Sequence, residues 1–481
     1  MVKAAGVILA AGAGTRFGGG KLFARIDGAP VLGHVVAAAR GAGLDPLVVV
    51  LAPDGTAHAT PFGLGQGEVI VNPEPGRGLS SSLQLGLAAA GAARPPVEAA
   101  VVLLGDQPLV RPETIRALLD ALDGSAEDVA VPRYADGGGA NPVALRRPAF
   151  RLAAEVIGDR GLGPLLEVAG AHVREVDVAG ANPDVDTAAD LARLAEMAWA
   201  DRVRRNREQV DRVREAPDGA DFYASVSSIF RDDPDRTGDA VLDALRAHAL
   251  PTDTWLDIGA GAGRYALPIA RGVREVVAID PSPSMLAALR DAMATFGIPN
   301  VRALEGRWPL DDVGSIESDV SLIAHVGYDV EAFGSFLDAM ERATRRTCLA
   351  VMMERTPAST AEPFWPPVHG EPRVALPALP ALVDLLVARG RSPSVEIPET
   401  SRRRWASREE LERFVRRQTW TEPGSAKDRR MVELLDAWLL TADDGSVELS
   451  VVEPLSIGVV AWSPRSPAEV SSDRLTVTGS V

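Results

Sequence analysis

Short apolar runs alternate with amphipathic segments along the first 200 residues. The runs are VILAA, PLVVVLA, EVIV and AAVVLL, and helical patterns such as residues 30–43 and 112–124 lie between them. The second of these patterns has Pro112 near its start and Gly124 near its end, as helices prefer. Because strands that alternate with helices form mostly parallel sheets covered on both faces, this half predicts a doubly wound α/β domain.

A second alternating series begins near residue 254. Its runs are TWLDIG, EVVAID, NVRALE, DVSLIAH and TCLAVMM, each followed by a helical or glycine-bearing segment. We therefore expect two three-layer α/β/α domains with Rossmann-like sheets, at residues 1–198 and 221–464. The pattern predicts a charged helical linker at 199–220 and a disordered tail, rich in serine, at 465–481.

Two further segments suggest local structure in the second half. Residues 355–380 are crowded with proline, which predicts a long loop or lid. Residues 448–463, ELSVVEPLSIGVVAWS, have the pattern of a terminal β-hairpin.

The net charge of −16 on 481 residues disfavours general binding to nucleic acid or to anionic membranes. Arginine-rich stretches at 201–215 and 401–418 contain interleaved acids, and Ser407 and Glu410 have capping-box spacing, so we interpret both stretches as solvated amphipathic helices. We expect small-molecule substrates, with anionic ones meeting locally basic pockets.

The chain has no apolar run of about 18 residues. Glycines, Thr15 and Arg16 interrupt the N-terminal segment where a signal peptide would have its apolar core. We therefore expect a cytoplasmic protein. The single cysteine, Cys348, lies in an apolar run, which favours a buried structural thiol over redox or zinc chemistry.

The first glycine-rich segment, AGVILAAGAGTRFGGGK, occupies residues 5–21. A Walker A alignment fails because it places Thr15 where glycine is required and Leu22 where a hydroxyl is required. Small residues from Ala10 to Gly14 would let backbone amides approach a phosphate chain. Arg16 and Lys21 can neutralise a triphosphate and the departing pyrophosphate.

Polar residues at other predicted strand ends complete this site. Asp106 ends the strand VVLLGD and would lie at the carboxyl edge of the sheet, where it suits Mg²⁺. Asn72 offers an amide to a nucleobase edge or to the substrate, and Ser80–Ser82 could cap a helix. Asp184 or Asp186 could complete the metal shell, although Asp186 could instead be a charge at a helix N-terminus.

The segments LAAGAGTRFGGGK, GDQP, GANPV and DVDTAADL together resemble the MobA-like nucleotidyltransferases over about residues 5–196, and in particular the molybdenum cofactor cytidylyltransferase branch. The resemblance implies transfer of CMP or GMP from CTP or GTP to a phosphorylated acceptor such as a molybdopterin, with loss of pyrophosphate. It also implies that Arg16 and Lys21 hold the phosphates and that Asp106 holds Mg²⁺. The expected nucleotide-binding residues are Leu9, Ala10, Ala11, Gly12, Gly14, Lys21, Asn72 and Ser81, and the expected metal ligands are Asp106 and Asp186. A sugar phosphate remains an alternative acceptor.

The second glycine-rich segment, LDIGAGAGR, has glycines at 259, 261 and 263. Arg264 stands where the dinucleotide fingerprint requires its third glycine, so the spacing disfavours NAD. Asp280 follows Gly259 by 21 positions, at the end of the next predicted strand, where a carboxylate suits the ribose hydroxyls of a cofactor.

The GxGxG spacing and the phrase DPSPSML resemble class I S-adenosylmethionine-dependent methyltransferases over about residues 221–464. By this resemblance the methionine part of S-adenosylmethionine would be lined by Asp257, Gly259, Gly261 and Gly263. Asp280 would bind the ribose, and Glu305, Gly306 and Arg307 would flank the adenine.

His325 and Tyr328 follow the fourth predicted strand of the second half, and are candidates for the acceptor pocket; packed residues at a strand end are the alternative. The sequence thus predicts a bifunctional transferase. A non-catalytic binding role for one half is the alternative.

Overall fold

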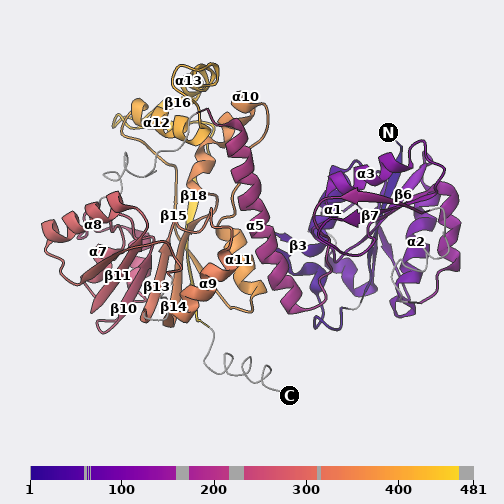
Figure 1. Ribbon diagram of the computed structural model, residues 1–481, viewed down its shortest axis with the longest axis horizontal. Helices are drawn as coiled ribbons and strands as arrows, with labels where there is room; N and C mark the ends of the chain where they lie inside the picture. The colour runs from indigo at the N-terminus through magenta and orange to yellow at the C-terminus, as the bar shows by residue number, and fades with distance from the viewer. Residues whose placement is uncertain are drawn as a thin grey trace. The chain divides into compact units, whose positions relative to one another are not determined.

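The computed structural model describes residues 2–12, 14–58, 62, 64, 65, 67–158, 173–215, 232–310 and 316–464. The chain divides into two compact units, Met1–Ala195 and Glu196–Val481, and each unit contains a seven-stranded sheet (Figure 1). The prediction of two α/β sheets flanked by helices is therefore confirmed. The expected tail at 465–481 lies outside the described residues, as do 216–231 around the expected start of the second domain.

The sheet of the first unit has the order β5-β4-β1-β6-β8-β7-β9. Its strands are β1 (Ala4–Ala10), β4 (Leu47–Leu51), β5 (Val69–Val71), β6 (Ala99–Leu104), β7 (Val129–Tyr134), β8 (Val143–Arg146) and β9 (Val173–Val178). β8 runs antiparallel to both of its neighbours, and the other pairs are parallel. A hairpin of β2 (Arg25–Ile26) and β3 (Ala29–Pro30) follows the 3₁₀ turn η1 (Lys21–Phe23).

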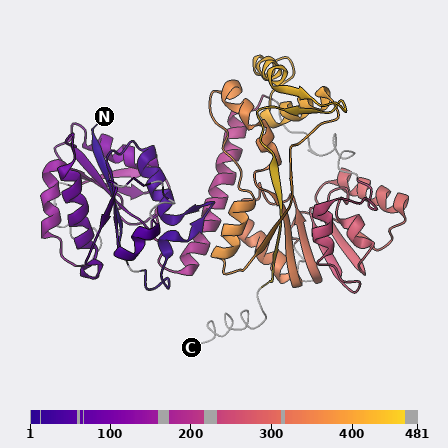
Figure 2. The ribbon, with the colours of Figure 1, turned by 180° about the vertical axis from the view of Figure 1, so that it is seen from behind.

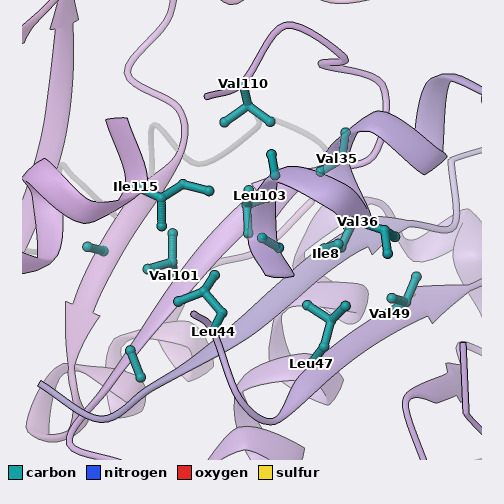
Figure 3. Packing of buried hydrophobic residues seen from close by; sticks show 14 of the residues in the cluster. Ile8, Val35, Val36, Leu44, Leu47, Val49, Val101, Leu103, Val110 and Ile115 are labelled. Atoms are coloured by element: carbon teal, nitrogen blue, oxygen red, sulfur yellow. The ribbon is translucent and has the colours of Figure 1, made fainter. Parts of the chain in front are cut away.

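Helices cover both faces of this sheet. α1 (Val31–Gly41) and α3 (Pro112–Leu122) pack on one face, in the cluster that contains Ile8 and Val101, as Figure 3 shows. α2 (Leu79–Ala92) packs on the other face, against Val7 and Val102. Every residue of β1 is buried because this central strand is covered on both sides, which explains its continuous apolar sequence.

The sheet of the second unit has the order β12-β11-β10-β13-β14-β18-β15 (seen from behind in Figure 2). Its strands are β10 (Thr254–Ile258), β11 (Glu275–Asp280), β12 (Val301–Glu305), β13 (Ser318–Ala324), β14 (Thr344–Met353), β15 (Ser394–Ser401) and β18 (Leu455–Trp462). The first five strands in this order are parallel, and β18 is antiparallel to β14 and β15.

One face of the second sheet is covered by α6 (Ala240–Arg246), α7 (Ala266–Ala270) and α8 (Pro283–Phe296). The other face carries α9 (Phe333–Arg342) and α11 (Leu379–Ala388). On that face a Cβ at Gly458 would lie 2.5 Å from Leu379, and Trp462 donates to Glu341 of α9. Cys348 is buried within this sheet, and burial raises the pKa of its thiol to about 12.

Much of the expected linker belongs to a packed helix. α5 (Ala188–Val213) crosses the boundary between the units, and its residues from Glu196 onward are part of the second unit. Trp199 stacks on Phe333 with ring centroids 4.3 Å apart, and Gln209 exchanges hydrogen bonds with the backbone of residues 372 and 374. Residues 199–213 therefore pack on the second unit. The charged pattern is interrupted by side chains such as Trp199 and Gln209, and these side chains make the contacts.

The predicted long loop at 355–380 is wrong for its first half. Residues there form the 3₁₀ helix η9 (Pro357–Phe364) and the short helix α10 (Trp365–His369). Phe364 and Trp365 are fully buried. Proline is compatible with the first turn of a helix, and the burial of two aromatic rings stabilises turns that the proline content disfavours.

The predicted terminal hairpin is also wrong. β17 (Val447–Leu449) pairs with β16 (Leu439–Thr441), whereas β18 pairs with β14 and β15. Alternating apolar residues indicate a strand but not its partner, which the topology decides.

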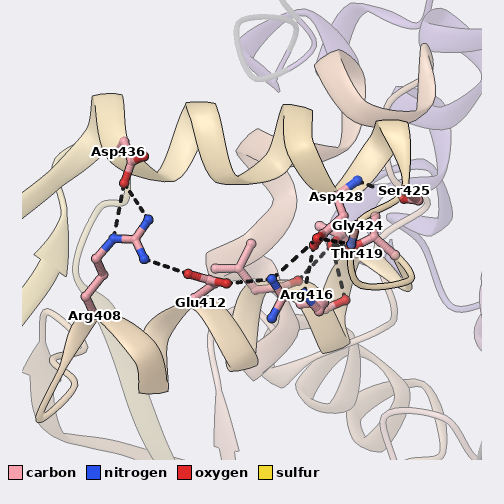
Figure 4. Close-up of polar contacts among 10 residues, drawn as sticks. Arg408, Glu412, Arg416, Thr419, Gly424, Ser425, Asp428 and Asp436 are labelled. Carbon is pink, nitrogen blue, oxygen red and sulfur yellow. Dashed lines mark hydrogen bonds and ion pairs between the residues drawn. The ribbon is translucent and has the colours of Figure 1, made fainter.

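Residues 402–454, which we call the insert, connect β15 to β18. The insert contains β16, β17, α12 (Arg408–Thr419) and α13 (Ala426–Trp438), and it shares a core with Phe364. Ion pairs join its two helices: Arg416 Nε lies 2.7 Å from Asp428 Oδ1, and Arg408 contacts Asp436 (Figure 4). The helix expected at 401–418 begins only after Ser407, whose hydroxyl accepts from the Glu410 amide as predicted.

Within the described part of the chain, no helix combines the length and the apolar character needed to cross a bilayer.

The ion pair between Arg391 and Glu341 is buried, so we expect that removal of one partner strongly lowers the stability of the second unit. The paired atoms lie 2.9 Å (Nε–Oε1) and 2.6 Å (Nη2–Oε2) apart. Arg391→Met would leave Glu341 buried and uncompensated, so we expect a loss of about 3–5 kcal/mol in the free energy of unfolding. The exposed pair of Arg408 makes Arg408→Met the control, with an expected loss below about 1 kcal/mol.

All eight tryptophans follow residue 196, so tryptophan fluorescence during urea unfolding reports on the second unit alone. Equal losses in the two variants would contradict the expected role of the buried pair.

Candidate active sites

The loops after β1 and β6 leave the first sheet at the same edge. The two strands are parallel neighbours, with Leu9 opposite Leu104. The Gly105 amide donates to Leu9 O at 2.9 Å, and a Cβ at Gly105 would lie 2.9 Å from Ala10 Cβ. Only glycine allows this approach, which brings Asp106 close to the small residues that follow β1.

Four of the predicted residues form one charged cluster at this edge. Lys21 Nζ lies 2.6 Å from Asp106 Oδ2 and 3.4 Å from Asp186 Oδ1, and Arg16 Nη1 lies 3.1 Å from Asp186 Oδ2. Burial alone would lower the pKa of Lys21, but the charges and hydrogen bonds of the two carboxylates outweigh it, and the pKa is raised. Lys21 is therefore a fixed cation between two acids.

Asp186 does not cap the following helix. α5 begins at Ala188, and it is Asp190 Oδ2 that accepts from the Thr187 amide at 2.9 Å and from the Asp186 amide at 3.3 Å. The Asp186 carboxylate is left to contact Lys21 and Arg16. Asp186 thus contacts two cations and lies two residues before α5, a position that fits both a metal ligand and a charge at the helix N-terminus.

Two buried carboxamides that the sequence analysis passed over support this cluster. Gln107 Nε2 donates to Asp184 Oδ1 at 2.9 Å, and Asn182 Nδ2 donates to Gln107 Oε1 at 3.0 Å. Asp184 reaches solvent, yet desolvation by its surroundings and then the charge of Asp106 raise its pKa. Adjacency to predicted acids in GDQP and ANPD was the signal that could have found both carboxamides.

Asn72 and the serines lie deeper than expected. Asn72 is 1% exposed; its Nδ2 donates to Ser81 Oγ and Ser82 Oγ, and its Oδ1 accepts from the Glu74 amide. The expectation that serines cap α2 is wrong, because Gly78 (φ 88°) occupies the cap position and the serines lie in the first turn. Asn72 and Ser81 therefore fix the segment that connects β5 to α2.

The small residues after β1 form the open side of the cluster. Leu9, Ala10 and Ala11 are buried, so they offer only backbone to a ligand. Gly12 is exposed, with no atoms near its missing side chain, and Gly14 has φ 57°. A Cβ at Gly14 would lie 3.4 Å from Lys21 Cγ, an ordinary contact distance, so it is the positive φ that favours glycine at this position.

In the second unit, the glycine spacing follows from backbone geometry. Gly259, Gly261 and Gly263 all have positive φ, at 75°, 54° and 89°. A Cβ at Gly259 would lie 2.4 Å from Val326, and one at Gly263 would lie 2.5 Å from Leu289. The loop after β10 can thus turn tightly against its neighbours only with glycine at these positions.

Asp280 ties the loops after β10 and β11 together. Its Oδ2 accepts from the Gly261 amide at 2.9 Å, and its Oδ1 accepts from the Ser282 amide at 2.8 Å. Asp257 is buried nearby, and its Oδ1 has no hydrogen-bond partner among the described residues. Burial, followed by the charge of Asp280, raises the pKa of Asp257 to about 7.

The segment after β12 reaches the same edge. Glu305 is the register partner of Asp280, and the Gly306 amide donates to Asp280 O at 3.1 Å. Glu305 and Arg307 are exposed. The structure therefore brings all the expected cofactor residues to the carboxyl ends of β10, β11 and β12.

His325 follows β13 in a strained conformation, with φ 56°. Tyr328 Oη accepts from the Met353 amide at 2.9 Å and lies 3.4 Å from His325 Nδ1. Burial lowers the pKa of His325 to about 4, helped by the charges of Arg264 and Arg403, so the imidazole is neutral near pH 7. The two predicted acceptor-pocket residues are thus in contact at one strand end.

Family models match both halves of the chain. Residues 6–176 match the MobA-like NTP transferase domain, and residues 256–346 match a methyltransferase domain. The chain joins a nucleotidyltransferase domain to a methyltransferase domain. Both predicted resemblances are confirmed at this level.

Curated relatives match only part of the chain. A probable molybdenum cofactor guanylyltransferase from Thermococcus kodakarensis is 31% identical over 135 residues, which are 27% of this chain and 60% of the relative. The bifunctional protein GlmU of Rhizorhabdus wittichii is 38% identical over 129 residues, 26% of this chain and 28% of GlmU. The chain thus spans less than two thirds of either relative.

Among solved structures, the crystal structure of Rv0371c from Mycobacterium tuberculosis H37Rv is 36% identical. The match covers 40% of this chain and 98% of that chain, with a TM-score of 0.36.

Two arginines of the methyltransferase domain were not predicted as site residues. In the sequence Arg264 only departs from the NAD fingerprint, and the pattern around Arg403 predicts a solvated helix. The structure places Arg403 before α12, and the charges of both arginines reach His325. Arg403 precedes the Ser407 capping signal by four residues. This position in the sequence could have indicated that Arg403 lies outside the helix.

The raised pKa of Asp257 predicts a pH-dependent stability of the methyltransferase domain. Between the ordinary value of 3.8 and about 7, the folded state retains a proton that the unfolded chain has released. Stability should therefore fall as pH rises through this window, by at most about 1.4 kcal/mol per pH unit. Asp257→Asn cannot titrate and should flatten the dependence.

Urea unfolding followed by tryptophan fluorescence across this pH range measures the effect. The exposed Asp291→Asn is the control and should behave as the wild type. An Asp257→Asn curve parallel to that of the wild type would refute the assignment.

Proposed function

We propose that the nucleotidyltransferase domain transfers CMP or GMP from CTP or GTP to a phosphorylated acceptor. The observation that carries this proposal is the convergence of Lys21 and Arg16 with Asp106 and Asp186 at the carboxyl edge of β1 and β6. Such edges are where open α/β sheets bind ligands. Cations fixed beside open glycine backbone suit a triphosphate.

In the proposed reaction, an acceptor phosphate oxygen attacks the α-phosphorus of the nucleotide. The bond from the α-phosphorus to the oxygen bridging to the β-phosphate breaks, and pyrophosphate leaves with the bonding electrons. Lys21 and Arg16 would hold the phosphates in line and offset the charge that develops on the leaving group. The step requires no covalent intermediate with the protein.

The residues present fit a divalent cation such as Mg²⁺. Asp106 and Asp186 supply hard carboxylate oxygens that already converge on one point, the ammonium of Lys21. When bound, the cation would supply charge neutralisation to the phosphates. Among the described residues no group of three or more His, Cys, Asp or Glu is arranged to hold a metal, so phosphate or water oxygens would complete the shell. Lys21 would then exchange its carboxylate partners for phosphate oxygens.

The names of relatives bear on the substrates. A molybdenum cofactor guanylyltransferase among them supports GTP as donor and a molybdopterin-like phosphorylated acceptor. CTP as donor and a sugar phosphate as acceptor are the alternatives for this domain.

We propose that the methyltransferase domain uses S-adenosylmethionine. The methyl group would pass from the sulfonium sulfur to a nucleophilic atom of a small-molecule acceptor, leaving S-adenosylhomocysteine. The glycine loop, Asp257 and Asp280 would hold the cofactor, and His325 and Tyr328 would line the acceptor pocket. Support comes from the shared edge to which β10, β11 and β13 bring these residues. The alternative is that one of the two domains binds its ligand without turnover.

The nucleotidyltransferase proposal predicts that Lys21→Met lowers the rate of pyrophosphate release from CTP or GTP by about 100-fold, because a preorganised cation is lost from the transition state. The assay uses the full chain, Mg²⁺ and a phosphorylated acceptor. Lys3→Met, on an exposed lysine, is the matched control and should keep the wild-type rate. If no nucleotide with Mg²⁺ raises the melting temperature of the wild type, the nucleotide assignment fails.

The methyltransferase proposal predicts that S-adenosylhomocysteine binds the full chain in a calorimetric titration. Asp280→Asn should weaken this binding about 10- to 100-fold, because a hydrogen-bonded charged group is worth about 1.5–3 kcal/mol. Asp291→Asn is again the control. Wild-type affinity in Asp280→Asn, or tighter binding of NADH than of S-adenosylhomocysteine, would overturn the proposal.

A further inference from the structure

Arg403 lies at the root of the insert, on the ligand-binding side of the second sheet. β15 and β14 are both antiparallel to β18, so they point in the same direction. The chain therefore leaves β15 at Ser401 on the edge where β14 ends at Met353 and where β13 leads into His325. Residues 402–404 start from the edge that carries the proposed acceptor pocket.

Two aromatic rings hold the Arg403 guanidinium. Its Cζ lies 4.3 Å from the centroid of the Phe414 ring and 5.2 Å from that of Trp405. Trp405 is buried, and the two rings are 5.5 Å apart. Contacts of this kind use the face of the planar guanidinium and leave the N–H groups at its edge available.

No acid of the described residues pairs with Arg403, an exposed residue whose pKa is lowered by desolvation of the guanidinium between the two rings. Its neighbours differ: Arg402 and Arg404 both contact Glu448, and Arg408 and Arg416 pair with acids of the insert. The acid whose charge acts on the pKa of Arg403 is Glu410, and it raises that pKa. The Glu410 carboxylate accepts from the Ala406 amide at 3.1 Å. Arg403 is thus a cation held by two rings, and none of the described residues accepts a hydrogen bond from it.

The Arg403 charge acts electrostatically on His325. It lowers the pKa of His325 together with Arg264 from the glycine loop, after the effect of burial. Arg264 is compensated, because it lies 2.9 Å from Asp232 and 4.0 Å from Asp239. Of the two guanidinium groups that act on His325, Arg403 is therefore the one that forms no ion pair with any acid in the described part of the chain.

We propose that Arg403 binds a carboxylate or phosphate group of the methyl acceptor, so that the methyltransferase domain acts on a small organic anion. This inference rests on the proposed methyltransferase function. A planar guanidinium binds either group through two parallel N–H···O bonds. The protein carries a net charge of −16, so a local cation is required to retain an anionic acceptor.

The test is a calorimetric titration of the full chain with benzoate, phenyl phosphate and the neutral analogue benzamide, with and without saturating S-adenosylhomocysteine. We expect benzoate or phenyl phosphate to bind and benzamide not to bind, and the tighter of the two anions identifies the group. Arg403→Met should weaken anion binding at least about 10-fold, the size of one charge-assisted interaction. Arg403→Lys should retain part of it, and Arg404→Met is the adjacent control.

An anion that binds instead at Lys21 would bind Arg403→Met unchanged, and that result would overturn the proposal. Equal binding of benzamide, or no anion binding to the wild type, would overturn it as well. Unchanged S-adenosylhomocysteine affinity and melting temperature in Arg403→Met would show that the fold is intact; if that variant unfolds, Arg403→Lys and the benzoate–benzamide comparison still decide. If S-adenosylhomocysteine does not bind to the wild type, that result would instead refute the methyltransferase proposal.

Discussion

Both units depend on the close approach of loops at the carboxyl ends of parallel strands. In the first unit, Gly105 donates to Leu9 O and thereby brings Asp106 to the loop that carries Lys21. In the second unit, Gly259 donates to Ile279 O at 2.7 Å and brings the glycine loop to Asp280. Each contact requires a residue without a side chain, so the charged groups of each site are positioned by backbone hydrogen bonds.

The two edges hold their acids differently, and the difference matches the ligands we propose. The acids Asp106 and Asp186 form ion pairs with a lysine and an arginine. Both cations could exchange these carboxylates for phosphate groups of a ligand. In the second unit Asp280 is held by backbone amides, and the buried Asp257 has a pKa of about 7. That edge offers hydrogen bonds to hydroxyl groups and an acid suited to a cationic cofactor, while its cations, Arg264 and Arg403, lie toward His325.

Patterns of short range were the most informative part of the sequence. The strands that end at Ala10, Leu104 and Asp280 were predicted because each contains a short apolar run, and the glycine spacing reflects local φ values. The errors arose where the partner of a segment is distant in sequence. Phe364 is buried against the insert, which stabilises the helical turns at 357–369, and the sheet order separated β17 from β18.

The sequence by itself determined the two α/β units, the two glycine loops and the acids that follow the strands, because these depend on the period of apolar residues and on backbone conformation. Only the tertiary structure decided which acids meet which cations. Asp186 lies 165 positions from Lys21, and Arg403 acts on His325 from another strand end. Electrostatic interactions depend on distance in space, and the strand order of each sheet sets that distance.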